Sequence, residues 1–296
     1  MRLKRILIGA ACLAAWYAYS GNPANFYTPS SPRSEKRLEE RVGSQYRLPD
    51  VIQTTTGPVT VKDIDFNGSF LLETPRYRLH KSEDFPWSRA IGYVASIPTK
   101  IFFWDSNASY GLDAERTKRV LAILENDKSL SGLTVRVNHT RAWYDTWRLF
   151  TEEKVTERNN WLARMFLGVP VTLLSGITSE FSRSDHYNPL TQTTIVYSNI
   201  DAIPFHEIGH HKDYQRFTSD WAYALMNTIF PPIKLYKEYQ ASMYAKDYLP
   251  PEQQYQFYRY LIPAYLTYLW AMWGLGKKFY RKYLRRGESL LEKDGD

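Results

Sequence analysis

Two histidines four residues apart constrain this chain more than any other feature of its sequence. His206 and His210 belong to the segment FHEIGH at positions 205–210. On an α-helix, residues four apart lie one turn apart on the same face, so both imidazoles can bind one metal ion. Asp201 and Pro204 come just before the pair, and both residue types are typical of a helix start. The sequence therefore predicts a helix here and a second element that faces it.

Glu207 gives this motif a chemical use beyond metal binding. Zn²⁺ in catalytic sites takes three protein ligands and leaves a fourth position for water. A carboxylate beside the two histidines can take a proton from that water as a general base. The pattern therefore predicts Zn²⁺ as cofactor, His206 and His210 as ligands and Glu207 as the catalytic residue. His211 points about 100° away from His210 on a helix and is not an expected ligand.

The third ligand has to come from another segment of the chain. The metzincin pattern, with a third histidine six residues after His210, is excluded because that position is Arg216 and the expected glycine at 213 is Asp213. The other arrangement of ligands takes the third one from a glutamate on a following helix. The candidates are Glu238 and Glu252.

Glu238 is the preferred candidate. Ala241 and Ala245 follow it at helical spacing, and this stripe of small residues lets its helix approach the motif helix closely. Glu252 instead follows two prolines at a helix start, where a carboxylate is explained by the helix dipole.

HEIGH at 206–210 followed by ExxAS at 238–242 resembles the gluzincin metallopeptidases, particularly their membrane-associated group with HExGH and a later ExxAD. The resemblance covers about residues 193–248. It implies that zinc is bound by His206, His210 and Glu238 and that Glu207 is the base. Residues 193–213 also resemble uncharacterised bacterial exported proteins with the same motif.

The resemblance also suggests roles for neighbouring residues. The aspartate of ExxAD, which orients a ligand histidine, is Ser242 here; a hydroxyl can accept the imidazole N–H but carries no charge. Asp213 is a possible substitute, or else a solvated helix residue. The β-branched run at 193–197 resembles the edge strand that holds an extended peptide. The substrate residues on that strand would be Thr194, Ile195, Val196 and Tyr197.

His186 and Tyr187 lie just before this strand, within an expected turn at 185–189. Either side chain can stabilise a transition-state oxyanion. The plainer interpretation is a turn with ordinary hydrogen bonds, and it is the favoured one.

The first 21 residues have the layout of a signal peptide or membrane anchor. Arg2, Lys4 and Arg5 precede an apolar run at 6–19, and Ser20 ends a passable cleavage site. Residues 22–50 are rich in serine, proline and charge and are an expected linker. The only cysteine is Cys12, which excludes a disulfide framework and fits an exported bacterial protein. We expect the periplasmic side of the inner membrane, with the protein either anchored or secreted.

Residues 51–255 are the expected catalytic domain, of α+β class and zincin-like, with a small mixed sheet, an edge strand beside the motif helix and a mainly helical C-terminal half. A hydrophobic content of 44% excludes a disordered chain. Strands are predicted at 51–66, 97–104, 133–137 and 193–197, and helices at 112–126 and 151–168. Residues 73–97 read as irregular. The uncharged stretch 165–178 is expected to be broken by Gly168, Pro170 and Gly176.

Residues 256–296 form an expected aromatic helix with a basic tail. Residues 260–276 carry no charge, and six basic residues follow between 277 and 286. At 1.5 Å per residue the uncharged part is short for a bilayer, which favours a core or interfacial helix in contact with a membrane surface. Nucleic acid is not an expected partner, because no base-reading module is visible.

These observations favour a zinc-dependent metallopeptidase that acts on peptides or proteins outside the cytoplasm. The alternative is an exported zinc-binding pseudo-peptidase, a scaffold that holds a partner at the membrane without cleaving it. A pure scaffold would have no chemical use for Glu207, which favours the enzyme.

Overall fold

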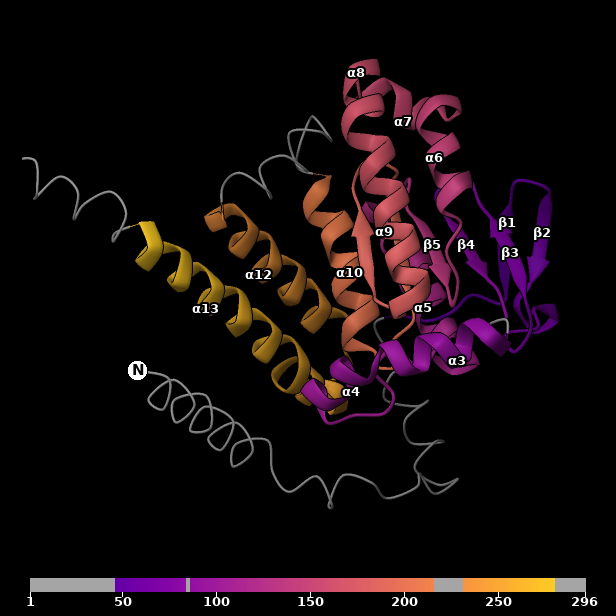
Figure 1. Ribbon diagram of the computed structural model, residues 1–296. Coiled ribbons are helices and arrows are strands. Elements are labelled where there is room, and N and C mark those ends of the chain that lie inside the picture. Colours follow the sequence, from indigo (N-terminus) through magenta and orange to yellow (C-terminus); the bar gives the residue numbers. More distant parts are fainter. Residues whose placement is uncertain (1–45, 84–85, 216–230, 280–296) are drawn as a thin grey trace, which may run out of the picture.

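The computed structural model describes residues 46–83, 86–215 and 231–279. In this part of the chain a five-stranded mixed sheet is covered by helices, and a two-stranded hairpin stands beside it (Figure 1). The expected α+β class is confirmed at this level. The expectations for the N-terminal signal or anchor, for most of the linker, for Arg216 and for most of the basic tail fall outside the described residues.

The secondary structure elements have the following bounds. The strands are β1 (Val51–Thr54), β2 (Gly57–Thr60), β3 (Phe70–Glu73), β4 (Arg78–Lys81), β5 (Thr134–Val137), β6 (His186–Asn188) and β7 (Thr193–Val196). The α-helices are α3 (Pro86–Ala95), α4 (Ile97–Phe103), α5 (Ala114–Asn126), α6 (Ala142–Thr151), α7 (Glu153–Arg158), α8 (Trp161–Ala163), α9 (Val169–Ser182), α10 (Ala202–Tyr214), α12 (Pro231–Tyr248) and α13 (Ile262–Phe279). Short 3₁₀ turns are η2 (Val61–Asp63), η3 (Lys128–Leu130) and η5 (Pro251–Gln253), and π-helical turns are η4 (Arg164–Gly168) and η6 (Phe257–Leu261).

The five strands lie in the order β3-β4-β5-β7-β6. β4, β5 and β7 are parallel, whereas β3 and β6 run antiparallel to their neighbours at the two edges. The prediction that residues 194–197 form an edge strand is therefore wrong. β7 lies inside the sheet and is buried along its whole length, as a β-branched run covered on both faces should be. The edge strand is β6, which forms within the segment expected to be only a turn.

One face of the sheet packs in the main hydrophobic core. Leu79, Val135, Val137 and Val196 are completely buried there, together with apolar residues of α5 and α10. α5 begins after Asp113, whose side chain accepts a hydrogen bond from the Arg116 amide at 2.8 Å. Its helical pattern of apolar residues, predicted from the sequence, provides the side that packs on the strands.

The strand predicted at 97–104 is instead helix α4. A short apolar run does not distinguish a strand from a helix, and here Pro98 occupies the first helical turn, where its missing N–H costs nothing. The parallel strand that precedes α5 is β4, in the region expected to be irregular. The strand–helix–strand unit is thus present, but it begins about twenty residues earlier than predicted.

The predicted break at 165–178 is also wrong. α8, η4 and α9 form one continuous helical segment, Trp161–Ser182, of 22 residues. Gly168 ends the π-helical turn, and Pro170 lies in the first turn of α9, so neither residue interrupts the helix. By length and composition this segment could cross a membrane, although core helices of soluble proteins pass the same test.

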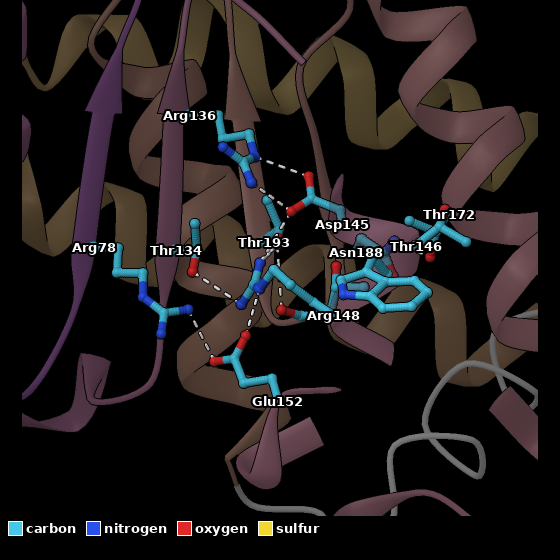
Figure 2. Close-up of polar contacts among 12 residues, drawn as sticks. Arg78, Thr134, Arg136, Asp145, Thr146, Arg148, Glu152, Thr172, Asn188 and Thr193 are labelled. Carbon is cyan, nitrogen blue, oxygen red and sulfur yellow. Dashed lines mark hydrogen bonds and ion pairs between the residues drawn. The ribbon is translucent and has the colours of Figure 1, made fainter. Parts of the chain in front are cut away.

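The second face of the sheet meets α6 through charges instead of apolar side chains (Figure 2). Asp145 accepts hydrogen bonds from Arg136 of β5 at 2.8 and 2.5 Å, and from Arg148 at 3.1 Å. Arg148 also donates to Thr193 of β7 at 2.8 Å and to Thr134 of β5 at 3.1 Å. These side chains are almost completely buried, so each charge depends on its partners.

The aromatic C-terminal helix is joined to the body by its first residues. Phe257, Tyr260 and Leu261 of η6 are buried in the same core as the strands. Phe103 of α4 packs edge-on against Tyr260, with ring centroids 5.5 Å apart. The described part of the segment 256–296 therefore packs on the body at η6, and α13 continues from there alongside α12 (Figure 1).

We expect Asp145→Ala to lower the free energy of unfolding by about 3–5 kcal/mol, because it leaves two buried guanidinium groups without their shared carboxylate. Urea denaturation followed by circular dichroism measures the change. The matched control is Glu153→Ala, at an exposed carboxylate of α7, with an expected change within about 0.5 kcal/mol. Equal losses for both variants would show that the buried network does not hold α6 on the sheet.

Candidate metal centre

The three predicted ligands lie together between α10 and α12. His206 Nε2 is 3.1 Å from His210 Nε2 and 3.2 Å from Glu238 Oε2, and His210 Nε2 is 3.7 Å from the same carboxylate oxygen. Within the described residues this is the cluster whose ligand atoms could hold a metal ion. Glu252, the alternative third ligand, is exposed in η5 and takes no part.

These separations suit a small cation. Ligand atoms about 2.0–2.2 Å from a tetrahedral ion lie roughly 3.3–3.6 Å from one another. The three observed separations, 3.1, 3.2 and 3.7 Å, span this range. Two imidazole nitrogens and one carboxylate oxygen therefore fit a divalent cation between them.

Ser242 sets the tautomer of one ligand. Its hydroxyl donates to the backbone carbonyl of Glu238 at 2.7 Å, so its oxygen is left to accept from His206 Nδ1 at 3.2 Å. With the proton on Nδ1, His206 presents the lone pair of Nε2 to the centre of the cluster. The contact expected between Ser242 and a ligand histidine is thus present.

The close approach of α10 and α12 depends on small residues. A Cβ on Gly209 would lie 2.7 Å from the backbone oxygen of Ala241 and 3.1 Å from its Cα. Ala241 and Ala245 are completely buried against α10, as their spacing predicted. Because Gly209 lies between the two histidines and Ala241 lies one turn after Glu238, this contact sets the distance between the ligands.

Nearby histidines favour the ionised carboxylate of Glu238, which is the form that binds a metal ion. Burial alone would raise the pKa of its carboxyl, but His210 and His206 hold that pKa well below the usual range. The group is therefore an anion that faces two imidazoles, which is the charge state a metal ligand needs.

Glu207 lies beside the cluster, held by the edge strand. Its carboxylate accepts a hydrogen bond from the backbone N–H of Tyr187 in β6. Burial raises the pKa of Glu207 to about 8; Asp185 and Glu238 also raise it, whereas His206 and the Tyr187 amide lower it. A cation bound nearby would lower this pKa as well, because its charge stabilises the carboxylate.

A cavity of about 210 Å³ connects these groups. His206, Glu207, Glu238 and Ser242 line one side of it. α13 forms another side, and its Tyr268 has a raised pKa because of burial and of the nearby Glu238 and Glu207. The remaining lining residues are Ile203 of α10 and residues of α4, of η6 and of the segments around 109, 184 and 198.

The other predicted residues have structural partners. Tyr187 stacks on His210 with ring centroids 6.5 Å apart, and its hydroxyl is hydrogen-bonded to His211 Nδ1 at 3.0 Å. His186 Nδ1 is 2.7 Å from Ser179 Oγ. Neither Tyr187 nor His186 lines the cavity. Asp213 is completely buried, and its charge acts on Lys237 of α12.

The residues at 194–197, predicted to bind substrate, instead contact the elements that carry the site. Thr194 Oγ1 donates to the backbone carbonyl of Glu207 at 3.5 Å, a long contact between β7 and α10. Ile195 pairs with His186 of the edge strand, and Val196 is in the core. The backbone amide of Tyr197 donates to Asp185 at 2.6 Å.

Asp185 and Tyr268 are among the cavity residues that were not predicted from the sequence. Asp185 lies there with a carboxylate that accepts from the Tyr197 and Ser198 amides, and Tyr268 reaches the site from sixty residues after the motif. The sequence signal for Tyr268 was its place in an uncharged aromatic helix, which favoured a core or interfacial helix and did not indicate that the residue lies near the motif.

Comparisons with protein-family models, with curated proteins and with solved structures find no match to this chain.

We expect Gly209→Ala to push α12 away from α10 and to misplace Glu238. The variant should lose affinity for metal and about 1–3 kcal/mol of stability, because the new methyl group meets backbone atoms that cannot rotate away. Metal content and urea denaturation are the measurements. The control is Gly274→Ala on α13, where a Cβ meets nothing within 4 Å and helix propensity improves. Full metal affinity in Gly209→Ala would contradict this role for the contact.

Proposed function

We propose that this protein is a zinc-dependent metallopeptidase of gluzincin type with a zincin-like catalytic domain. The observation that supports it best is the convergence of His206 Nε2, His210 Nε2 and Glu238 Oε2 within 4.8 Å of one another, beside a cavity that Glu207 also lines. A scaffold would need the three ligands alone, whereas hydrolysis needs a carboxylate beside them.

Zinc is the proposed cation because of the donor set. Two imidazoles and one carboxylate leave a fourth position open in a tetrahedral site, and this set is common in hydrolytic zinc enzymes. Zn²⁺ bound here would polarise the scissile carbonyl and lower the pKa of a water molecule.

Glu207 acts on the proton of that water. In the proposed reaction its carboxylate accepts the proton as the oxygen attacks the carbonyl carbon, and then passes it to the leaving nitrogen. The Tyr187 amide holds the carboxylate in place, so the position of the base is set by the edge strand. β6, not β7, is then the strand to which an extended substrate would add.

Tyr268 is the proposed donor to the oxyanion that forms on the carbonyl oxygen. It lines the cavity near Glu207 and Glu238, and burial keeps its hydroxyl protonated. A neutral hydroxyl fixed in a cavity can donate to a developing negative charge without reorganising. Tyr187, an earlier candidate for this role, has its hydroxyl on His211 instead.

The proposed location is the periplasmic side of a bacterial inner membrane. The apolar segment at 6–19 with its basic start supports export or anchoring, and the net charge of +7 favours contact with an anionic membrane surface. α13 contributes to this contact, since it exposes Leu266, Leu269, Trp270 and Trp273 on its outer side. Peptides or proteins are the proposed substrates, and nucleic acid is not.

Glu207→Gln and Glu238→Gln should separate catalysis from metal binding. Glu207→Gln is expected to keep one Zn²⁺ per chain and to lose peptidase activity by several orders of magnitude, because the base is removed while the ligands stay. Glu238→Gln should lose both. Elemental analysis and hydrolysis of a peptide library measure the two properties.

The control for these variants is Glu252→Gln, which changes an exposed carboxylate and should leave metal and activity unchanged. If the wild type binds zinc and cleaves no peptide, the pseudo-peptidase scaffold is the better function.

Tyr268→Phe is expected to lower kcat by about 10²-fold with little change in KM, because the donated hydrogen bond matters mainly in the transition state. Steady-state kinetics on one peptide measure both constants. Tyr265→Phe is the matched control: it removes the hydroxyl of a second cavity tyrosine on the same helix. An equal loss in both variants would assign the effect to the helix instead of the Tyr268 hydroxyl.

A further inference from the structure

Helix α6 has charged side chains inside, together with Leu149, and tryptophans outside. Asp145 and Arg148 are buried against the sheet, at 3% exposure each. Trp143 and Trp147, one turn apart on the same helix, are 75% and 65% exposed. A helix on the surface of a soluble protein normally shows the opposite arrangement.

The segment η4–α9 beside it has the same inverted polarity. Its buried residues are small or polar: Gly168, Thr172, Gly176 and Ser179. Its outer side exposes Phe166, Leu174, Ile177 and Phe181, at 78, 65, 42 and 51%. Residues 165–179 carry no charge. α6 and α9 run side by side (Figure 1), so their outer residues form one apolar surface, which we call the α6–α9 face.

α9 is attached to the body along its length. Asn188 of β6 donates to Thr172 at 3.0 Å, and His186 is 2.7 Å from Ser179. A Cβ on Gly176 would lie 2.6 Å from the Cβ of Ala142 in α6, so the two helices touch closely. The helix therefore cannot cross a bilayer on its own, surrounded by lipid, although its 22-residue segment is about 33 Å long. Its outer side alone is available to an apolar environment.

A groove on this face combines apolar walls with a cation. It measures about 430 Å³ and is lined by Trp143, Ile177 and Phe181, with Arg141 and Glu180 also present. The Glu180 carboxylate accepts from Thr140 and from the Tyr197 hydroxyl. Arg141 is an exposed residue whose Nη2 lies 3.5 Å from His80 Nε2. Apolar side chains next to an arginine, with Trp143 among them, match the acyl chains and phosphate groups of a lipid leaflet.

We infer that the α6–α9 face lies in one leaflet of an anionic lipid bilayer, with α9 roughly parallel to the membrane plane. A continuous exposed apolar surface over two neighbouring helices is unusual on a protein in water. The net charge of +7 provides long-range attraction to such a bilayer. This surface is formed by other residues than the exposed side of α13.

The position of α9 also indicates where the substrate is held. His186 and Asn188 of β6 point toward α9, whereas the amide of Tyr187 between them holds Glu207. The strand proposed to receive the substrate is therefore packed directly on the lipid-facing helix. The proposed substrates are therefore polypeptides that are held at the membrane surface. This assignment rests on the proposed peptidase function.

Lipid-depth measurements on the full chain test the inference. In a Cys12→Ser background, a single cysteine is placed by Leu174→Cys and labelled with a polarity-sensitive fluorophore. Vesicles of phosphatidylcholine and phosphatidylglycerol should shift its emission to the blue, and nitroxides on the lipid acyl chains should quench it. Phe166→Cys repeats the measurement at a second exposed position, in case one variant fails to fold.

The control position is Lys128→Cys in η3, exposed on the side of the sheet that α10 covers. Its probe should show neither the shift nor the quenching, even when the N-terminal segment binds the vesicle. Equal responses at 128 and 174, or no response at 174 and 166, would overturn the inference. A blue shift at 174 without lipid that grows with protein concentration would also overturn it, in favour of a second copy of this chain.

The substrate class needs a separate readout. Leu174→Asp should lower hydrolysis of a peptide tethered to vesicles by a lipid and leave hydrolysis of the same free peptide unchanged. Equal rates for tethered peptide in variant and wild type would overturn the substrate assignment. Absence of hydrolysis of either peptide would refute the proposed function, whereas the fluorescence result would still decide the membrane contact.

Discussion

The backbone contact between Gly209 and Ala241 is the constraint on which the metal centre depends. A histidine pair on one helix supplies two ligands at a distance that helix geometry sets by itself. The third ligand comes from a helix about thirty residues later in the chain, and its distance depends on how closely the two helix axes approach. Without a Cβ at 209, backbone atoms of α10 and α12 touch, and Glu238 is brought within 3.7 Å of both imidazole nitrogens. Ser242, one turn after Glu238, then reaches His206 and sets its proton on Nδ1.

The two faces of the sheet are built on different physical principles. The face toward α5 and α10 is apolar, and it supports the motif helix through ordinary core packing. The face toward α6 is held by Asp145, Glu152 and the arginines around them (Figure 2). Buried ion networks add little net stability but tolerate few alternative arrangements, because any displaced charge is left without its partner. This arrangement leaves the apolar residues of α6 and α9 on the outside, where we place the lipid.

The edge strand β6 connects these two halves of the molecule. Successive side chains of a strand point to opposite faces, so His186 and Asn188 contact α9 while the Tyr187 ring stacks on a ligand histidine of α10. The proposed membrane surface and the proposed catalytic base are therefore separated by helix α9 and one strand, β6. The aromatic helix α13 lies on the opposite side of the cavity and places Tyr268 in its wall. The same helix exposes tryptophans on its outer side, where we propose contact with the membrane.

The sequence determined the local part of this centre. The spacing of His206 and His210 defines two ligands because a helix repeats every 3.6 residues, and the alanines after Glu238 indicated which glutamate could approach them. The helix at 112–126 and the strands at 133–137 and 193–197 were also readable, since their apolar periodicity is local. The position of β7 inside the sheet was not, because strand order depends on contacts between distant segments. Likewise α4 could not be told from a strand, since a mostly apolar run of seven residues fits either structure.

The sides of α6 and α9 that meet water depend on the tertiary structure and could not be predicted from the sequence. For α6 and α9, the polar residues find partners on the sheet that no local pattern reveals, so the apolar side is turned outward. The same is true of Tyr268 and Asp185, which lie in the cavity because η6 anchors α13 in the core and because the Tyr197 and Ser198 amides hold the aspartate. Helix periodicity thus specified the pair of histidine ligands. The cavity around them and the exposed apolar face depend on packing between distant segments, which the spacing of residues within one segment does not encode.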